Sequence, residues 1–385
     1  MLGGKIGSKS HVVNTQSQTG AANPRTKSID GVGILSHNRR TMSASLNGSR
    51  RPTMRDVAEL AGVSLKTVSR VFNSEPNVRA DVRERVESAV ASLGFRRNIV
   101  AKNLRDGLGT ASIGLVIADL LNPFYAAIAT AVETVANRHQ ATLIIASSAE
   151  DPGRERQVVT GLLERHVDGL IVVPTGNDHG YLEPQRRLGI HVVFLDRAAA
   201  GIEADAVVLD NVEGARRAVE HLVALGHRRI GFVGDSEGLP TAQERLAGYR
   251  LALSEAGIAF DPAIVRGGSP RSELAEVSAR QLLTGEDPPT AIFAENNRNC
   301  IGVVRAVRSL ERAVGVVGFD DFELADLLAV PVTVVAYDPG ELGRAGAELL
   351  FARMGGDLRP PQRIVIPTRL VVRGSGELQP EAALR

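Results

Sequence analysis

Apolar residues are spaced differently in three parts of the chain, and the spacing predicts where ordered structure begins. Residues 1–50 are rich in Ser, Gly, Asn, Thr and Arg and show no sustained period of about 2.0 or 3.6 residues. Such a segment buries too little apolar surface to offset the entropy of ordering, so we expect a disordered tail. Met42 is an alternative start site inside this tail.

Between residues 52 and 72 the apolar positions fit two short helices joined by a tight turn. Thr53 and Ser64 are suitable N-cap residues for helices over 54–61 and 65–72, and Gly62 supplies the positive φ that ends the first. The inner faces are expected to consist of Val57, Leu60 and Ala61 in the first helix, and of Val68, Val71 and Phe72 in the second.

Two further helical segments are predicted before the pattern changes. One covers residues 80–93 and ends at Gly94. Its inner face is expected to consist of Val82, Val86, Ala89, Val90 and Leu93. The other covers residues 98–104 and is too short to be stable alone in water.

From residue 111 onward, short β-rich runs alternate with amphipathic helices, for example over 212–225 and 341–354. The ten predicted strands cover residues 112–118, 142–146, 169–173, 191–194, 206–209, 229–233, 290–293, 314–317, 333–336 and 364–366. Most of these runs are apolar throughout, as in strands that helices cover on both faces. Repeated strand–helix units imply parallel sheets with right-handed crossovers. This many strands form two doubly wound subdomains rather than one wide sheet.

Charge is distributed unevenly, although the 385 residues carry a net charge of only +1. Residues 1–50 carry a net charge of +6, residues 51–109 carry +4 and the remainder carries −9. A basic N-terminal part on an acidic body suggests that the N-terminal part meets a polyanion. The alternative is a solvated basic tail that contacts nothing.

Composition excludes several kinds of protein and site. Cys300 is the single cysteine, so an internal disulfide is excluded and a reducing compartment is expected. Neither an apolar stretch of about 18 residues nor the apolar segment of a secretory signal is present, so we expect a cytoplasmic protein without membrane contact. All five lysines precede residue 103, which excludes a Schiff-base or P-loop lysine from the body.

The first two predicted helices and their turn have the dimensions of a helix-turn-helix motif. Ala58 is small where the helices cross, and the second helix directs Leu65, Lys66, Ser69 and Arg70 outward. Lysine and arginine donate to guanine and phosphate, and one good base contact discriminates by about 1–3 kcal/mol. The alternative is a plain three-helix bundle with a solvated basic face. Because the caps, the turn and the basic face agree, DNA binding is the favoured interpretation.

One long run and several short motifs resemble a known family. Residues 53–73 read TMRDVAELAGVSLKTVSRVFN, and residues 98–105 read NIVAKNLR. The body contains NPFY at 122–125, RHVDGL at 165–170, EHLVALGHRRI at 220–230, ERLAGY at 244–249 and VVGFDD at 316–321. Together these motifs, spread over about residues 52–375, resemble the LacI/GalR family of bacterial transcription regulators.

The resemblance implies how the chain is organised. It implies a basic tail (1–50), an all-α helix-turn-helix domain (51–97), a hinge helix and linker (98–109), an α/β body (110–375) and a C-terminal tail (376–385). The body would resemble periplasmic binding proteins, with two interleaved, doubly wound parallel-sheet subdomains that bind an effector and dimerise.

The resemblance also implies DNA contacts. Leu65, Lys66 and Arg70 would read the major groove. The side chains available for phosphates or bases are Thr53, Ser64, Thr67, Ser69 and Asn73. Leu104 would be an apolar wedge in the minor groove, since an exposed leucine on a marginal helix gains partners by unstacking a base step. The alternative is that Leu104 packs on the body. Two such hinges in a homodimer imply a pseudo-palindromic operator in double-stranded DNA, and a tetramer stays open.

Three positions before the predicted hinge depart from the family pattern. Arg79 and Val82 stand where the family has a Ser or Thr that opens the third helix and a Thr inside it, so we expect that helix to lack its cap. Arg97 replaces a proline, which predicts a looser and more basic hinge.

Polar and aromatic side chains follow the predicted strands of the body. In doubly wound sheets the carboxyl ends of the strands border the ligand cleft. Carboxylates, an arginine and an aromatic wall suit a polyhydroxylated ligand such as a sugar, because each hydroxyl both donates and accepts hydrogen bonds. The resemblance places Asp196, Arg245, Asn296 and Asp320 at effector-contacting positions, with Phe124, Tyr125 and Tyr337 as walls. The alternative for each residue alone is a helix cap or an internal ion pair.

The expected function is an effector-controlled DNA-binding regulator, most often a repressor, that needs no cofactor and no metal. Asn297, where the family has an aspartate, and a shortened turn at 311–313 weaken the sugar interpretation. Two alternatives stay open: a periplasmic-type sugar-binding protein, against which residues 52–105 argue, and a constitutive regulator that has lost its effector. We expect no enzyme, because no Ser-His-Asp order, phosphate loop or metal-spaced histidine pair stands out.

Overall fold

The computed structural model describes residues 52–95, 111–268 and 271–378. The predicted hinge over 98–109, which includes Leu104, lies outside these residues, as do Arg97 and the tail over 1–50. The chain divides into two compact units, Met1–Arg96 and Arg97–Arg385. None of the helices in the described ranges is both long enough and apolar enough to cross a lipid bilayer.

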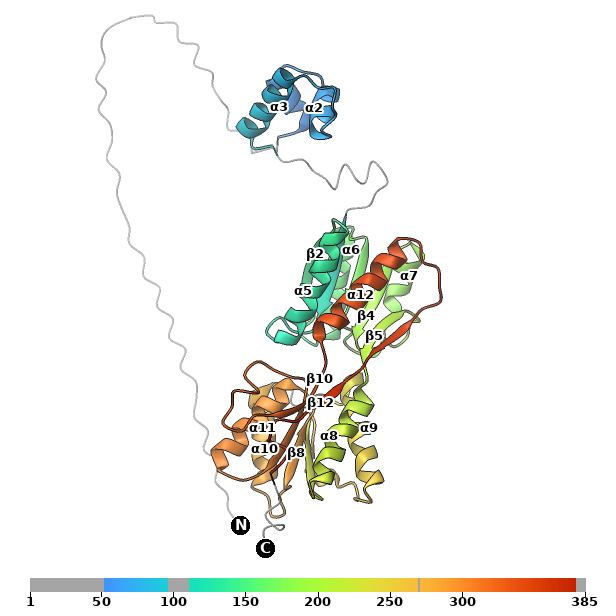
Figure 1. The fold of residues 1–385 in the computed structure, drawn as a ribbon. Coiled ribbons are helices and arrows are strands. Elements are labelled where there is room, and N and C mark those ends of the chain that lie inside the picture. The colour runs from blue at the N-terminus through green and yellow to red at the C-terminus, as the bar shows by residue number, and fades with distance from the viewer. Residues whose placement is uncertain (1–51, 96–110, 269–270, 379–385) are drawn as a thin grey trace, which may run out of the picture. The chain divides into compact units, whose positions relative to one another are not determined.

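Three helices form the described part of the first unit: α1 (Met54–Ala61), α2 (Leu65–Phe72) and α3 (Ala80–Leu93) (Figure 1). Thr53 begins α1 with a capping box, in which its hydroxyl accepts from the Asp56 backbone and the Asp56 carboxylate accepts from the Thr53 backbone. Gly62 ends α1 in the left-handed region at φ 64°, and Ser64 caps α2. The predicted turn between two short helices is thus confirmed.

The three helices enclose a small core that matches most of the predicted inner faces. Its buried members are Val57, Ala58, Ala61, Val68, Val71, Val86, Ala89 and Phe95. The predicted burial of Leu60 is wrong, since this side chain is 55% exposed. The buried face of α1 is centred between Val57 and Ala58, and Leu60 lies roughly 100° around the helix from that centre. As expected, α3 starts at Arg79 without a side-chain cap.

Two six-stranded sheets form the body. The first consists of β1 (Ser112–Ile117), β2 (Thr142–Ser147), β3 (Gly169–Val172), β4 (His191–Asp196), β5 (Asp205–Leu209) and β11 (Arg363–Ile366). The second consists of β6 (Ile230–Val233), β7 (Val265–Arg266), β8 (Ala291–Ala294), β9 (Gly315–Phe319), β10 (Thr333–Ala336) and β12 (Arg369–Val371). The strand orders, β11-β5-β4-β3-β1-β2 and β12-β10-β9-β8-β6-β7, repeat one topology twice.

Helices connect and cover the strands of each sheet (Figure 1). They are α5 (Pro123–Arg138), α6 (Pro152–Glu164), α7 (Glu183–Arg187), α8 (Asn211–Ala224), α9 (Pro240–Glu255), α10 (Ser272–Leu283), α11 (Asn297–Leu310) and α12 (Pro339–Met354), with 3₁₀ turns at Gly180–Leu182 and Pro262–Ile264. Two of the packed pairs approach at glycine. A Cβ on Gly248 of α9 would lie 2.2 Å from the Val212 carbonyl oxygen of α8, and one on Gly302 of α11 would lie 2.4 Å from the Ser272 carbonyl oxygen of α10. A larger residue at either position would therefore push the helices apart.

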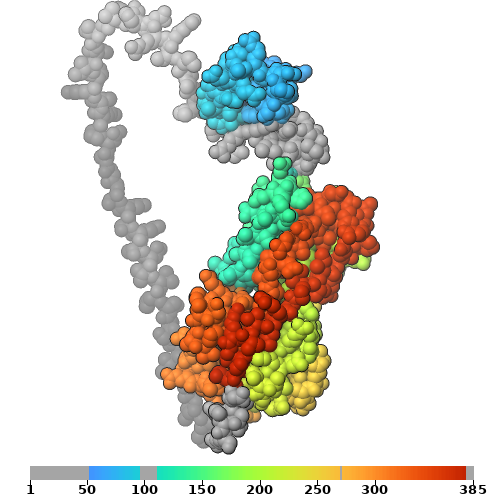
Figure 2. Space-filling view, in the orientation of Figure 1, coloured from blue at the N-terminus to red at the C-terminus, as the bar shows by residue number. Residues whose placement is uncertain are grey.

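The body has two lobes, and the chain passes between them three times. The first lobe contains the first sheet with α5, α6, α7 and α12, and the second contains the second sheet with α8 to α11. The crossings lie between β5 and α8, between β10 and α12, and between β11 and β12. Figure 2 shows the C-terminal segment, in red, running along both lobes. The two interleaved lobes are those expected from the alternating pattern.

All ten predicted strands are present, with ends that shift by no more than two residues. Two strands were not predicted, because β7 has two residues and β12 has three, and runs this short show no periodicity. The expectation of wholly parallel sheets needs one correction, since β12 pairs antiparallel with β10. Only two residues separate β11 of the first sheet from β12 of the second. A strand parallel to β10 would need a crossover helix before it, and this connection is too short to contain one.

Candidate nucleic-acid interface and ligand cavity

The start of α2 presents two side chains to solvent. Leu65 is 48% exposed, and Lys66 is exposed without a hydrogen bond or ion pair to any residue of the described ranges. Ser69 and Arg70, one turn further along α2, are half-buried. An exposed apolar side chain and an exposed ammonium lie side by side here. Such a surface suits a partner that presents both anionic and apolar groups, and DNA presents both at its major groove.

Three of the predicted phosphate contacts already cap helices in this structure. The Thr53 hydroxyl donates to Asp56 Oδ2 over 2.7 Å, and Ser64 Oγ accepts from the Thr67 backbone N–H over 3.1 Å. Thr67 Oγ1 lies 2.9 Å from Ser64 Oγ. Asn73 is the C-cap residue of α2 and is exposed. Contacts from these residues to DNA would therefore be made from positions that the helix ends hold in place.

Arg70 has a partner within its own unit. Its Nε donates to Glu75 Oε2 over 2.8 Å, and its Nη2 lies 3.4 Å from the Asn77 carbonyl oxygen. Both side chains of the ion pair are partly exposed, so the pair contributes little to stability. A guanidinium that binds DNA from this position must first leave Glu75.

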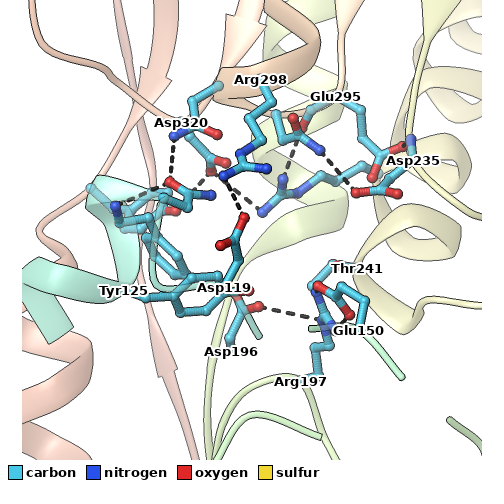
Figure 3. Close-up of a pocket in the computed structure, with 16 residues that line it drawn as sticks. Asp119, Tyr125, Glu150, Asp196, Arg197, Asp235, Thr241, Glu295, Arg298 and Asp320 are labelled. Carbon is cyan, nitrogen blue, oxygen red and sulfur yellow. Dashed lines mark hydrogen bonds and ion pairs between the residues drawn. The ribbon is translucent and has the colours of Figure 1, made fainter. Parts of the chain in front are cut away.

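In the body, the carboxyl ends of the central strands of both lobes border one cavity of about 70 Å³, here named the inner cavity (Figure 3). Its lining residues are Asp119, Asn122, Phe124, Tyr125, Glu150, Asp196, Arg197, Asp235, Thr241, Arg245, Glu295, Asn296, Asn297, Arg298, Asp320 and Tyr337. All seven residues predicted to contact an effector are among them, and they come from both lobes. The structure thus brings together residues more than 200 positions apart in the sequence.

Arg245 is a buried cation of the inner cavity with partners on several sides. It is 4% exposed, and its Nε donates to Asn211 Oδ1 and its Nη1 to the Glu295 carbonyl oxygen, over 2.9 and 2.8 Å. Its Nη2 lies 3.5 Å from Asp320 Oδ1, and its guanidinium stacks over the Phe319 ring at 3.8 Å. Hydrogen bonds, an ion pair and a cation–π contact therefore fix the orientation of Arg245 before any ligand binds.

Asp196 and Asp320 occupy equivalent places in the two lobes. Asp196 ends β4, Asp320 follows β9, and both have φ 67°, in the left-handed region that non-glycine residues rarely adopt. The Tyr337 hydroxyl donates to Asp320 Oδ1 over 2.7 Å. Strained aspartates at facing strand ends are typical of binding sites, where the surrounding structure holds them in place.

Arg197 contacts two carboxylates of the first lobe, those of Glu150 and Asp196. Its Nη1 and Nη2 donate to the two carboxylate oxygens of Glu150 over 2.8 and 2.9 Å, and its Nε lies 3.4 Å from Asp196 Oδ2. Burial raises the pKa of Asp196 to about 6, although Arg197 acts in the opposite direction. The guanidinium therefore forms a two-pronged ion pair with Glu150 and a longer contact with Asp196.

An aromatic wall closes one side of the inner cavity. The ring centroids of Phe124 and Tyr125 are 4.8 Å apart and those of Phe124 and Tyr337 are 6.1 Å apart, both in edge-to-face arrangements. Phe124 and Tyr125 lie in the first turn of α5, which starts at Pro123 after the N-cap residue Asn122. Such a wall offers an apolar face to a ring whose edges hydrogen-bond to the charged side chains.

Two polar contacts join the lobes across the inner cavity. Arg298 of the second lobe forms an ion pair with Asp119 of the first, and Figure 3 shows these side chains pointing toward one another. Asn297 Nδ2 donates to Asn122 Oδ1 over 2.9 Å. All four residues belong to the lining, so these two contacts link the lobes directly at the inner cavity.

Sequence reasoning missed part of the lining. Asp119, Glu150, Asp235, Thr241, Glu295 and Arg298 were not singled out, although Asp235 and Glu295 each lie two residues beyond the end of a predicted strand. Their position just after a strand is the signal that would have indicated them. Asn296 lines the inner cavity but also caps α11, because its Oδ1 accepts from the Asn299 backbone N–H over 2.9 Å. Its Nδ2 donates to Asp235 Oδ2 over 3.4 Å.

Comparisons with known proteins agree with both units. The model of bacterial regulatory proteins of the lacI family matches residues 53–98, and that of the periplasmic binding protein-like domain matches residues 219–376. The ribose operon repressor of Haemophilus influenzae is 31% identical over 327 residues, which are 84% of this chain and 98% of the repressor.

Two solved structures extend the comparison to the whole fold. The transcriptional regulator CelR–cellobiose complex is 30% identical with a TM-score of 0.64, over 84% of this chain and 100% of that chain. The lac repressor dimer bound to operator and the anti-inducer ONPF is 28% identical with a TM-score of 0.73, over 85% and 99%. Fold and matches together define a bacterial DNA-binding transcriptional regulator. The chain belongs to the LacI family, which confirms the resemblance seen in the sequence.

Proposed function

We propose that the chain is a homodimeric repressor that acts in the bacterial cytoplasm on a pseudo-palindromic operator and is controlled by a sugar or sugar derivative. The observation that carries the effector part is that the seven predicted residues, from two lobes, line one cavity. The α2 helix enters the major groove with Leu65, Lys66 and Arg70 directed at bases.

A polyhydroxylated effector fits the chemistry of the inner cavity. Asp196 and Asp320 offer acceptors, Arg245 offers oriented donors, and Phe124 and Tyr337 offer an apolar wall. The names of the relatives, a ribose operon repressor and a regulator solved with cellobiose, support this class of ligand. Arg373 holds Asp321 in a two-pronged ion pair, while Asp320 is bound by Tyr337 and Arg245. We therefore assign Asp321 a structural role and Asp320 a role in ligand binding, rather than a catalytic role to the two adjacent acids.

Control follows from the three crossings between the lobes. An effector that contacts both lobes binds the closed and open arrangements unequally and shifts their populations. The first lobe begins at residue 111, just after the predicted hinge over 98–109. A change in lobe orientation is therefore passed directly to the segment that joins the body to the helix-turn-helix unit.

A thermal-shift screen of the purified chain against sugars, sugar phosphates, nucleobases and polyols tests this function. A sugar or sugar derivative is expected to raise the melting temperature by preferential binding to the folded state. The hit is expected to change binding to an inverted-repeat operator from the genomic neighbourhood in gel shifts. A chain that binds no inverted repeat better than scrambled competitor would contradict the proposal.

Removing the carboxylate beside Arg70 is expected to strengthen DNA binding. In Glu75→Gln the Arg70 guanidinium loses its ion-pair partner. Binding to a base or phosphate then no longer requires that this ion pair be broken, so the free energy of DNA binding becomes more favourable. Since an exposed pair contributes about 0.2–1 kcal/mol, operator affinity should rise by a few-fold at low salt. Fluorescence anisotropy with labelled operator measures the change. Equal affinity of the two proteins would show that Arg70 does not leave Glu75 on DNA.

Breaking the ion pair across the inner cavity is expected to speed effector binding. In Arg298→Gln the lobes lose their charged link through Asp119, so the open arrangement is populated more often. Stopped-flow measurements should show an association rate for the screened effector that rises several-fold. Arg305→Gln, which removes an exposed cation from the same helix, is the matched control. An unchanged rate in Arg298→Gln would mean that this pair does not limit admission.

A further inference from the structure

The inner cavity contains more acidic groups than its arginines can neutralise. Six carboxylates line it, against three guanidiniums and no lysine or histidine. Three of the carboxylates are matched one to one. Glu150 pairs with Arg197, Asp119 with Arg298, and Asp320 with Arg245. The remaining carboxylates are Asp196, Asp235 and Glu295.

Asp235 and Glu295 lie next to each other on the wall formed by β6 and β8 (Figure 3). The two strands are paired, and the Glu295 backbone donates to the Val233 carbonyl oxygen over 2.9 Å. Glu295 Oε2 accepts from the Asp235 backbone N–H over 2.8 Å. Within the described residues, neither carboxylate forms an ion pair within 4.0 Å. Glu295 is only 2% exposed, so water does not compensate its charge.

The pKa values of both acids are raised, chiefly by burial. Burial raises the pKa of Glu295 to about 7, and the nearby Asp235 carboxylate acts in the same direction. Burial also raises the pKa of Asp235. A cation bound beside them would lower both pKa values.

An independent observation is that one buried acceptor of the inner cavity has no donor. Asn297 is 5% exposed, and its Oδ1 has no hydrogen-bond partner in the structure. Its amide cannot be turned around, because its Nδ2 must face Asn122 Oδ1, which also accepts from the Phe124 backbone N–H. Of the neutral donors nearby, the Tyr337 hydroxyl donates to Asp320, and Asn296 Nδ2 donates to Asp235 Oδ2 over 3.4 Å. The cavity therefore offers acceptors to a ligand that brings donors.

We propose that the effector is an amino sugar whose protonated amine lies against Asp235 and Glu295. This inference rests on the proposed function, in which the inner cavity is the effector site. An ammonium carries three donors, no acceptor and one positive charge, which are the features that the lining leaves unmatched. The sugar ring lies on the aromatic wall, and its hydroxyls reach Arg245 and Asp320. Among the described residues no group of three metal-ligating side chains is present, which favours an amine over a metal ion.

The test compares matched ligands on the full chain by titration calorimetry at neutral pH. The probes are D-glucosamine and D-galactosamine, their neutral parents D-glucose and D-galactose, and the two N-acetylated forms. An amino sugar is expected to bind at least about tenfold more tightly than its parent and its N-acetylated form, the size of one charge-assisted hydrogen bond. Equal or tighter binding of the uncharged forms would overturn the inference, and so would a failure of both amino sugars to bind.

Two isosteric variants locate the amine. Glu295→Gln and Asp235→Asn remove one charge each and keep the side-chain shape, so each should lower the preference for the amino sugar by about tenfold. Glu237→Gln, which removes an exposed carboxylate of the same loop outside the lining, should keep the preference. A preference that survives in both Glu295→Gln and Asp235→Asn would overturn the assignment.

A third variant separates this inference from the proposed function. If neutral sugars bind and their affinity falls in Asp320→Asn, the inner cavity is the effector site, and only the inference that the effector carries an amine is wrong. If sugars bind with affinities that none of the cavity variants changes, the inner cavity is not the effector site, and the proposed function falls with the inference.

Discussion

Replacing Lys66 with alanine should lower affinity for a specific operator by roughly tenfold to a hundredfold. Lys66 is exposed at the start of α2 and has no partner within the described part of its unit, so its ammonium is free to contact a base. A good base contact discriminates by about 1–3 kcal/mol, and each 1.4 kcal/mol is tenfold in affinity. Fluorescence anisotropy with the operator and with a scrambled duplex measures specific and non-specific binding separately.

The matched control is Arg85→Ala, which removes the same charge from an exposed position on α3. Both variants lose one positive charge, so both weaken non-specific binding through the phosphates by a similar, salt-dependent amount. Only Lys66→Ala should also reduce the ratio of operator to scrambled affinity. Equal ratios in Lys66→Ala and the wild type would remove Lys66 from the base-reading surface.

Glu295→Gln should stabilise the body by about 3 kcal/mol above pH 7 and leave its stability unchanged below about pH 4.5. Burial raises the pKa of Glu295 from 4.5 to about 7, while Asp235 and Asp320 raise it further and Arg245 lowers it. One pKa unit corresponds to 1.36 kcal/mol. Between these two pH values the folded chain holds a proton that the unfolded chain releases, so wild-type stability falls as pH rises. A glutamine does not titrate and escapes this loss.

Urea denaturation of both proteins from pH 4 to pH 8 measures the effect as a difference in unfolding free energy. Glu237→Gln serves as the control, because its carboxylate is exposed and lies outside the inner cavity. A difference that stays constant across this range would mean that Glu295 titrates normally in the folded protein. An acid that lowers the stability of the folded protein in this way is expected to serve ligand binding rather than folding.

The fold could be predicted from the sequence because its signals are local. Apolar runs such as 314–317 indicate buried strands without reference to their neighbours, and Thr53 and Gly62 mark helix ends through their own backbone preferences. Leu60 was misplaced because an eight-residue helix fixes its buried face by what packs on it, and the pattern of α1 alone allows more than one face.

The cavity could be predicted only in part, because its composition depends on register. Asp196, Arg245 and Asp320 were predicted from their motifs and strand ends, and they line the cavity. The contact of Glu295 with Asp235 exists because β6 and β8 pair with Val233 beside Ala294, which no local pattern encodes. The ion pair of Asp119 with Arg298 joins residues of different lobes, which no local pattern links.

The interleaved path of the chain also sets an order for synthesis. β11 and β12 are the edge strands of the two sheets, and they are the last strands to be made. The first sheet is complete only after residue 366 has left the ribosome, and the second only after residue 371. The helices of residues 54–93 are released early and have a core of their own. A nascent chain stalled late in translation would therefore carry a folded DNA-binding head on a body that cannot yet respond to its effector.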